Sequence, residues 1–141
     1  MSNSTSAQFA KLWSAKLERV KRILRKLPGD LGNESLKFFL DSFKKEQSPD
    51  GKPWQPRKQN GSGDRSTRRA LLVLSGRLRK SIKLTRVTAI GFSIGSNTPY
   101  GKYHNEGAGK IPKREFLGKS VASNRRLMRM IKAKILLALR H

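Results

Sequence analysis

Apolar residues recur at helical spacing over the first third of the chain, in two stretches separated by a helix-breaking pair. The first stretch, Phe9–Leu27, predicts an amphipathic helix that ends at Pro28-Gly29. A second helix is expected to begin at Asp30 or Asn33 as N-cap and to end before Pro49. Its apolar side consists of Leu36, Phe39, Leu40 and Phe43. We therefore predict a pair of helices at the N-terminus.

The middle of the chain has a different pattern. Three prolines and an Asp50-Gly51 turn within "SPDGKPWQPRK" predict an extended, turning segment at 48–58. The stretch from Gln59 to Thr67 contains no apolar residue, and we expect a mobile loop over about 58–68. Order is expected to return as a short helical turn within "RRALLVLSGRLRKSI".

Alternating apolar positions follow, and then a last helical stripe. Ile82 and Leu84, a break near 85–89, and a second apolar set predict a β-hairpin with one buried face. That second set is Ile90, Phe92 and Ile94. The final helix is predicted at about 119–139. Its apolar stripe is Val121, Met128, Ile131, Ile135 and Leu139.

Length and charge narrow the picture further. The 141 residues fit one domain, and we expect a single domain over 1–141. Lysine and arginine number 32 against 9 acidic residues, which gives a net charge of +23. Self-repulsion on this scale predicts an anionic partner. Without cysteine, a secretion signal or a long apolar run, the sequence favours a soluble protein that is made and used inside a cell.

The residues that could support catalysis are few. His104 and Glu106 could form a base and its orienter, but no nucleophile or second acid accompanies them, and His141 is terminal. One internal histidine and scattered carboxylates do not supply a metal site. The glycines of "GSGDRST" and "GAGK" lack the setting of a phosphate loop and are read as turns. We therefore expect no enzyme activity, no cofactor and no metal.

Clusters of cations are the stronger signal. One lies between Arg65 and Arg86, and the other in the last helix. Either cluster alone could be a solvated helix face, whereas the excess over the whole chain favours contact with phosphates through the backbone of a nucleic acid. A membrane-surface role for the last helix is also open, but its apolar face has no aromatic anchor. We prefer packing against the domain or a neighbouring subunit.

Three motifs occur in order: "SPDGKPWQP", "LSGRLRKSI" and "NTPYGKYHNEGAGKIPKREFLG". Together they resemble the phage virion morphogenesis family, the tail-completion and head-to-tail joining proteins of tailed phages. With the flanking helices, the resemblance covers roughly residues 8–139. The positions that fit the family's motifs are Asp50, Gly51, Trp54, Gly76, Arg77, Leu78, Ser81, Tyr100, His104, Gly107, Arg114, Phe116, Leu117 and Gly118. Two positions depart from the pattern, because Gly101 replaces a small apolar residue and Glu115 a common proline.

The resemblance implies an α+β fold, in which long N- and C-terminal helices pack on a small antiparallel sheet. It also implies a structural protein of the phage neck or tail end. Such a protein would form a homo-oligomeric ring, expected to be a hexamer, that completes the tail and joins it to the head around the DNA passage. It would occupy the virion, after assembly in the host cytoplasm, with other neck and tail proteins as partners and no membrane contact.

Two sets of residues are expected to carry this role. Subunit or partner contacts are predicted at Trp54, Arg77, Tyr100, Tyr103, His104, Arg114 and Phe116. Contacts with genomic DNA, without sequence reading, or with an acidic partner are predicted at Arg125, Arg126, Arg129 and Lys132. The alternative function is that of a stand-alone basic nucleic-acid-binding protein.

Overall fold

The computed structural model describes residues 2–58, 70–73 and 75–140 and contains four helices and one two-stranded sheet within them. Most of the predicted loop at 58–68 lies outside the described residues. The elements are, in chain order, α1 (Ser2–Lys45), α2 (Arg77–Ser81), β1 (Ile82–Thr88), β2 (Gly91–Ser96), α3 (Gly101–Glu106) and α4 (Val121–Arg140).

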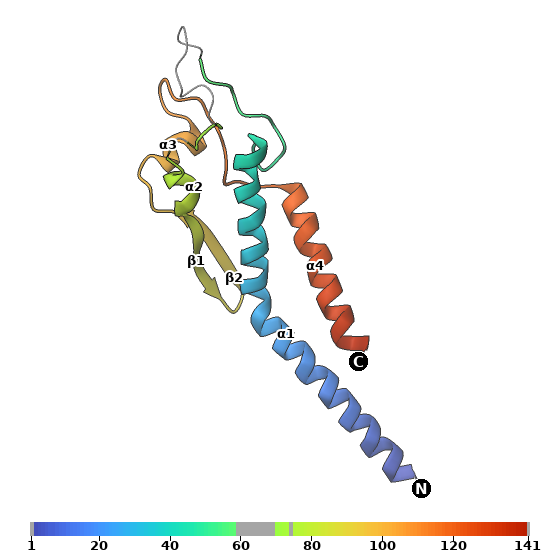
Figure 1. The fold of residues 1–141 in the computed structure, drawn as a ribbon. Coiled ribbons are helices and arrows are strands. Elements are labelled where there is room, and N and C mark those ends of the chain that lie inside the picture. The colour runs from blue at the N-terminus through green and yellow to red at the C-terminus, as the bar shows by residue number, and fades with distance from the viewer. Residues whose placement is uncertain (1, 59–69, 74, 141) are drawn as a thin grey trace.

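The C-terminal half of α1 is the centre of the fold. Figure 1 shows it between the β1–β2 hairpin on one side and α4 on the other, while the N-terminal half extends well beyond both. α4 runs antiparallel to α1, since Arg126 pairs with Glu34 whereas Lys134 pairs with Asp30. Long terminal helices on a small antiparallel sheet confirm the α+β prediction.

The prediction of two N-terminal helices is wrong, because α1 is continuous through Pro28-Gly29. A proline inside a helix removes one backbone hydrogen bond and crowds the preceding turn, so it costs stability. Packing offsets this cost: Pro28 and Gly32 are buried, and a Cβ on Gly32 would lie 2.6 Å from Leu84 Cδ1 in β1. Figure 1 shows α1 change direction about midway, which is the usual effect of an internal proline. α1 bends at the pair instead of ending there.

α1 ends where the backbone of Glu46 turns left-handed, with φ 51°. The Glu46 carbonyl accepts the Trp54 amide at 2.7 Å, and its carboxylate Oε1 accepts the Leu71 amide at 2.7 Å. Between them, Gly51 adopts φ 91° in a tight turn that returns the chain. The predicted extended, turning segment is thus confirmed.

The hairpin is confirmed, but two of its details differ. β1 does not break near Thr85; the register shifts there between Leu84 and Arg86, so the irregularity is a β-bulge inside a longer strand. Ile90 was expected on the buried face, but it occupies the turn and is 97% exposed.

Two helices differ from the sequence-based expectation as well. The short helix α3 (Gly101–Glu106), which includes His104, was not among the predicted elements. α4 confirms the last helix, but its buried side is lined by Ser123 and Ala138, while Val121 and Met128 are mostly exposed. Small residues allow α4 to approach α1 closely, and Ile131 and Ile135 of the predicted stripe are half-buried.

The core lies where the C-terminal half of α1 meets the loops that follow it. Phe43 and Phe116, each 1% exposed, are its most deeply buried side chains. The other buried members are Trp54, Leu71, Leu78 and Ile82. Because these residues come from five separate segments, the core fixes the loops as well as the helices.

Candidate assembly surfaces

Trp54 joins the extended segment to the long loop that precedes α4. Its ring packs edge-on against Phe43, with 5.5 Å between centroids, and Phe43 in turn lies 5.4 Å from Phe116. The indole Nε1–H donates to the Glu115 carbonyl at 2.8 Å. A buried indole of this kind is both a packing unit and a polar bridge. It holds two segments together that are 61 residues apart in sequence.

Arg114 makes a second bridge between the same two segments. Its Nε–H donates to the Gln55 carbonyl at 2.9 Å, and its amide donates to the His104 carbonyl at 2.7 Å. Burial lowers the pKa of the guanidinium, and the positive charge of Arg57 lowers it further. An arginine pKa is so high that the group stays charged, so the backbone carbonyls must satisfy it.

Asn105 of α3 holds the segment that precedes α4. Its Oδ1 accepts the amides of Phe116 and Leu117, each at 2.9 Å, and its Nδ2 donates to the Leu117 carbonyl at 3.0 Å. One side chain thus satisfies three backbone groups of a segment without regular structure. This residue was not predicted from the sequence, although asparagine side chains near helix ends commonly bond to backbone groups.

A row of hydroxyls ties the beginning of the loop to the sheet. Ser96 Oγ lies 2.6 Å from Ser81 Oγ and 2.8 Å from Thr98 Oγ1. Gly101 follows in a tight site, where a Cβ would lie 3.0 Å from Thr98 Oγ1 and 3.1 Å from Leu78 Cδ1. The absence of a side chain at Gly101 is therefore what lets α3 pack on this row. We call residues 98–118, so anchored at both ends, the braced loop.

His104 faces a cavity of about 370 Å³ beside the braced loop. Tyr100 packs edge-on against its ring at 6.1 Å, and Arg57 and Arg114 also line the cavity. Burial lowers the pKa of His104, and the charge of Arg114 adds to this effect. Its Nδ1 is buried and has no hydrogen-bond partner among the described residues. The ring is thus held neutral near pH 7.

Apart from His104, which is half-buried at the cavity, the predicted contact residues divide into two groups. Arg77, Tyr100 and Tyr103 are exposed, with Tyr103 at 52%. Their side chains are available to a partner on the surface of the braced loop and α2. Trp54, Arg114 and Phe116, by contrast, are buried within the chain and shape this surface from below.

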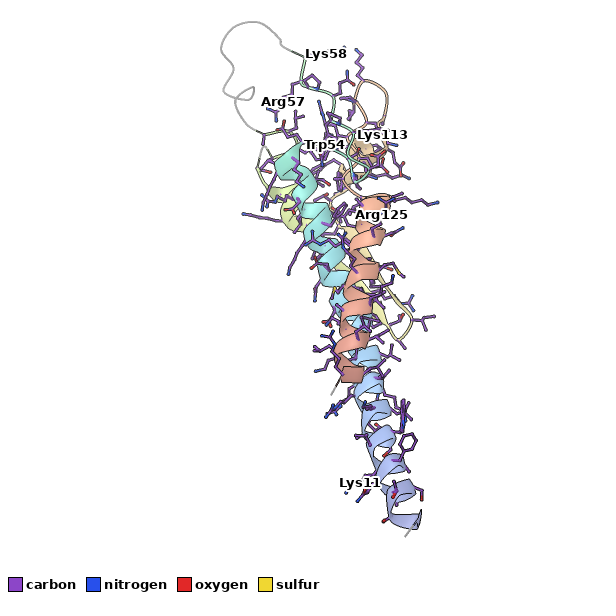
Figure 2. All side chains as sticks on the ribbon, turned by 90° about the vertical axis from the view of Figure 1, so that its right-hand side faces the viewer. Lys11, Trp54, Arg57, Lys58, Lys113 and Arg125 are labelled. Carbon is purple, nitrogen blue, oxygen red and sulfur yellow. The ribbon has the colours of Figure 1, made fainter. Side chains whose placement is uncertain are left out.

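The predicted cations of α4 also divide. Arg125, Arg129 and Lys132 are exposed and follow one another at helical spacing, so they share one face. Arg126 points elsewhere and forms an ion pair with Glu34 of α1. Figure 2 shows Arg125 near the start of α4, and Trp54 and Lys113 together at the end of the molecule opposite Lys11.

Within the described ranges, no three histidine or acidic side chains lie close enough to hold a metal ion. Nor is any helix of the described chain both long and apolar enough to span a bilayer.

The sequence matches the profile of the phage virion morphogenesis family over residues 5–135, from the N-terminal part of α1 to most of α4. Neither a curated protein nor a solved structure matched the chain. Because the match includes the helices, the sheet and the braced loop, this chain belongs to the phage virion morphogenesis family.

Proposed function

We propose that this protein forms a ring at the phage neck or tail end, where it completes the tail and joins it to the head around the DNA passage. Membership of the family gives it a role in building the virion. The ring, the position at the neck and the joining step are our proposal. No step of bond-making chemistry is required, since the role consists of shape-specific contact between proteins.

The observation that carries the proposal is the outward row of cations on α4. Arg125, Arg129 and Lys132 are exposed, and residues 121–140 contain six lysines and arginines and no acid. Repeated around a ring, such a face forms a continuous positive surface. A surface of this kind attracts DNA phosphates without reading the sequence.

The braced loop supports the proposal from a second side. Trp54, Asn105 and Arg114 hold it through hydrogen bonds to backbone groups, while Tyr100 and Tyr103 remain outside. A loop fixed in one shape loses little conformational entropy when it docks, which favours a specific contact between subunits. This agrees with a structural role for His104 as part of the loop.

Genetics in a phage that encodes this chain tests the proposal. Infection without the protein is expected to yield filled heads and separate tails, and supplying it should restore joined particles. Joined, infectious particles formed in its absence would refute the proposal. They would favour the alternative of a stand-alone nucleic-acid-binding protein, which has no part in joining.

The cationic row has its own test in the same complementation. The triple change R125E/R129E/K132E should reduce infectious particles by at least about tenfold, because it reverses the surface offered to DNA. The matched control K37E/K45E/K83E makes the same change in charge at exposed lysines outside α4. If both triples complement equally well, the row has no function of its own.

A further inference from the structure

The N-terminal part of α1 projects beyond the end of α4. We call residues 4–26 the arm. Side chains 4–15 are all exposed, and the first ion pair between α1 and α4 occurs only at Asp30. Figures 1 and 2 both show this end of α1 extending past the end of α4, and Figure 2 labels Lys11 on it. At 1.5 Å per residue the arm is about 35 Å long.

An apolar stripe runs along the arm. Its most exposed members are between 46% and 63% accessible, namely Phe9, Leu12, Trp13, Leu17 and Leu24. Positions 9, 13, 16, 20, 23 and 27 alternate in steps of four and three, which is the spacing of a coiled-coil seam. Leu17 and Leu24 widen the seam on one side, and Leu12 widens it on the other. A stripe of this width requires a partner.

Most of the charges lie on the other side of the helix. The arm carries seven lysines and arginines and one acid, Glu18. Four of these cations lie at helical positions opposite the stripe, and Arg19 and Lys26 flank it beside Leu12. A surface that covers the stripe therefore meets at most the two flanking cations and need not be acidic. DNA would meet the cations but would leave the apolar stripe in water.

One cation, Lys16, falls inside the seam. Its Nζ lies 5.8 Å from the ring centroid of Trp13, and Trp13 packs edge-on against Phe9 at 5.9 Å between centroids. The ring offers the ammonium group a favourable local contact. A single lysine at a seam position fixes the register and number of helices at a cost in stability. The seam is thus suited to a defined assembly of like helices.

We propose that the arms of neighbouring copies pack side by side through this stripe, so that they form a parallel helical bundle beneath the ring. The inference rests on the proposed ring, since cyclic symmetry gives every arm the same direction. The exposed apolar area of one stripe is on the order of 500 Å². Two stripes together reach the roughly 1,000 Å² that a specific interface requires, before the ring body contributes.

The charges predict how this association responds to salt. The cations of adjacent arms repel one another, and only Glu18 offsets them within each arm. Raising the salt concentration shortens the range of this repulsion, so arm packing should strengthen. Binding to DNA or to an acidic protein has the opposite dependence, because salt weakens it.

Single cysteines test the packing directly, because the chain has none of its own. Val20→Cys places a thiol in the seam with little change in volume. Ser14→Cys, on an exposed position of the basic side, is the matched control. Each full-length variant is oxidised at about 0.05 M and about 0.5 M salt, across which the Debye length falls severalfold. Disulfide-linked dimers are then counted on a gel.

We expect the Val20→Cys dimer to exceed the Ser14→Cys dimer by at least about fivefold, and more strongly at the higher salt. In sedimentation, Lys16→Leu should lower the concentration for half-assembly by at least about tenfold, because it removes the charge from the seam. Equal yields for the two cysteines, or yields that fall with salt, would overturn the inference. So would binding of the arm to anionic vesicles or duplex DNA without Val20→Cys dimers.

Failure of this inference is distinguishable from failure of the proposed function. If Val20→Cys does not cross-link but loss of the protein still separates heads from tails, the function stands and the arm bundle falls. If the cysteines cross-link and particles join without the protein, the bundle stands and the neck role falls.

Discussion

Replacing Asn105 by alanine should loosen the braced loop. The side chain makes three hydrogen bonds, two to the amides of Phe116 and Leu117 and one to the Leu117 carbonyl. Each lost bond to a partly buried backbone group costs about 1 kcal/mol, so the total is about 3 kcal/mol. For a chain of 141 residues, this loss corresponds to a fall in melting temperature of about 10 °C.

Urea unfolding, followed by the fluorescence of the tryptophans, measures the loss. Asn105→Asp is the conservative variant, because its carboxylate can still accept both amides, and it should lose about half as much. Asn97→Ala, at an exposed position just before the loop, is the control and should stay within about 0.5 kcal/mol of the parent. Hydrogen exchange at the amides of Phe116 and Leu117 should accelerate only in the Asn105 variants. A loss below about 1 kcal/mol for Asn105→Ala, with unchanged exchange there, would refute the clamp.

Three further changes test other parts of the loop. Trp54→Phe keeps the aromatic packing but removes the hydrogen bond to the Glu115 carbonyl, so the free energy of unfolding measured in urea should fall by about 1–2 kcal/mol. No change would show that this hydrogen bond does not stabilise the fold. Gly101→Ala should lower the free energy of unfolding by about 1–3 kcal/mol, because the new Cβ would lie 3.1 Å from Leu78 Cδ1. An unchanged free energy of unfolding would mean that the neighbouring side chains move aside without cost. The pKa of His104 is lowered in the folded chain, so the unfolded chain binds the proton more readily and stability should fall as pH drops below about 6.5. His104→Gln should flatten this fall in a pH series of melting temperatures. An unchanged slope would mean that other groups cause the fall.

Local patterns predicted most of the elements. The helical spacing of Leu36, Leu40 and Phe43 identified the C-terminal part of α1, and alternation identified the hairpin. The error at Pro28 has a physical cause. Proline and glycine are local signals of helix ends, but the apolar phase continues across them, since Leu31 follows Leu27 by four residues. Packing of this face against β1 and α4 overrides the local preference.

The buried contacts that support the braced loop could not be predicted from local sequence patterns. Trp54 and Arg114 were recognised from motifs, and the structure shows that they bond to carbonyls 61 and 59 residues away in sequence. Such pairs depend on tertiary folding, which periodicity does not describe. The difference between Arg126, which is ion-paired, and the other three predicted cations of α4 also depends on tertiary folding, because only the fold brings Glu34 next to Arg126.

The most direct measurement is a cryo-electron-microscopy reconstruction of the head–tail junction in intact phage particles that encode this chain. We predict a closed collar of copies of this chain there, with the α4 cations toward the DNA. Density for the junction that is complete without this polypeptide would contradict it.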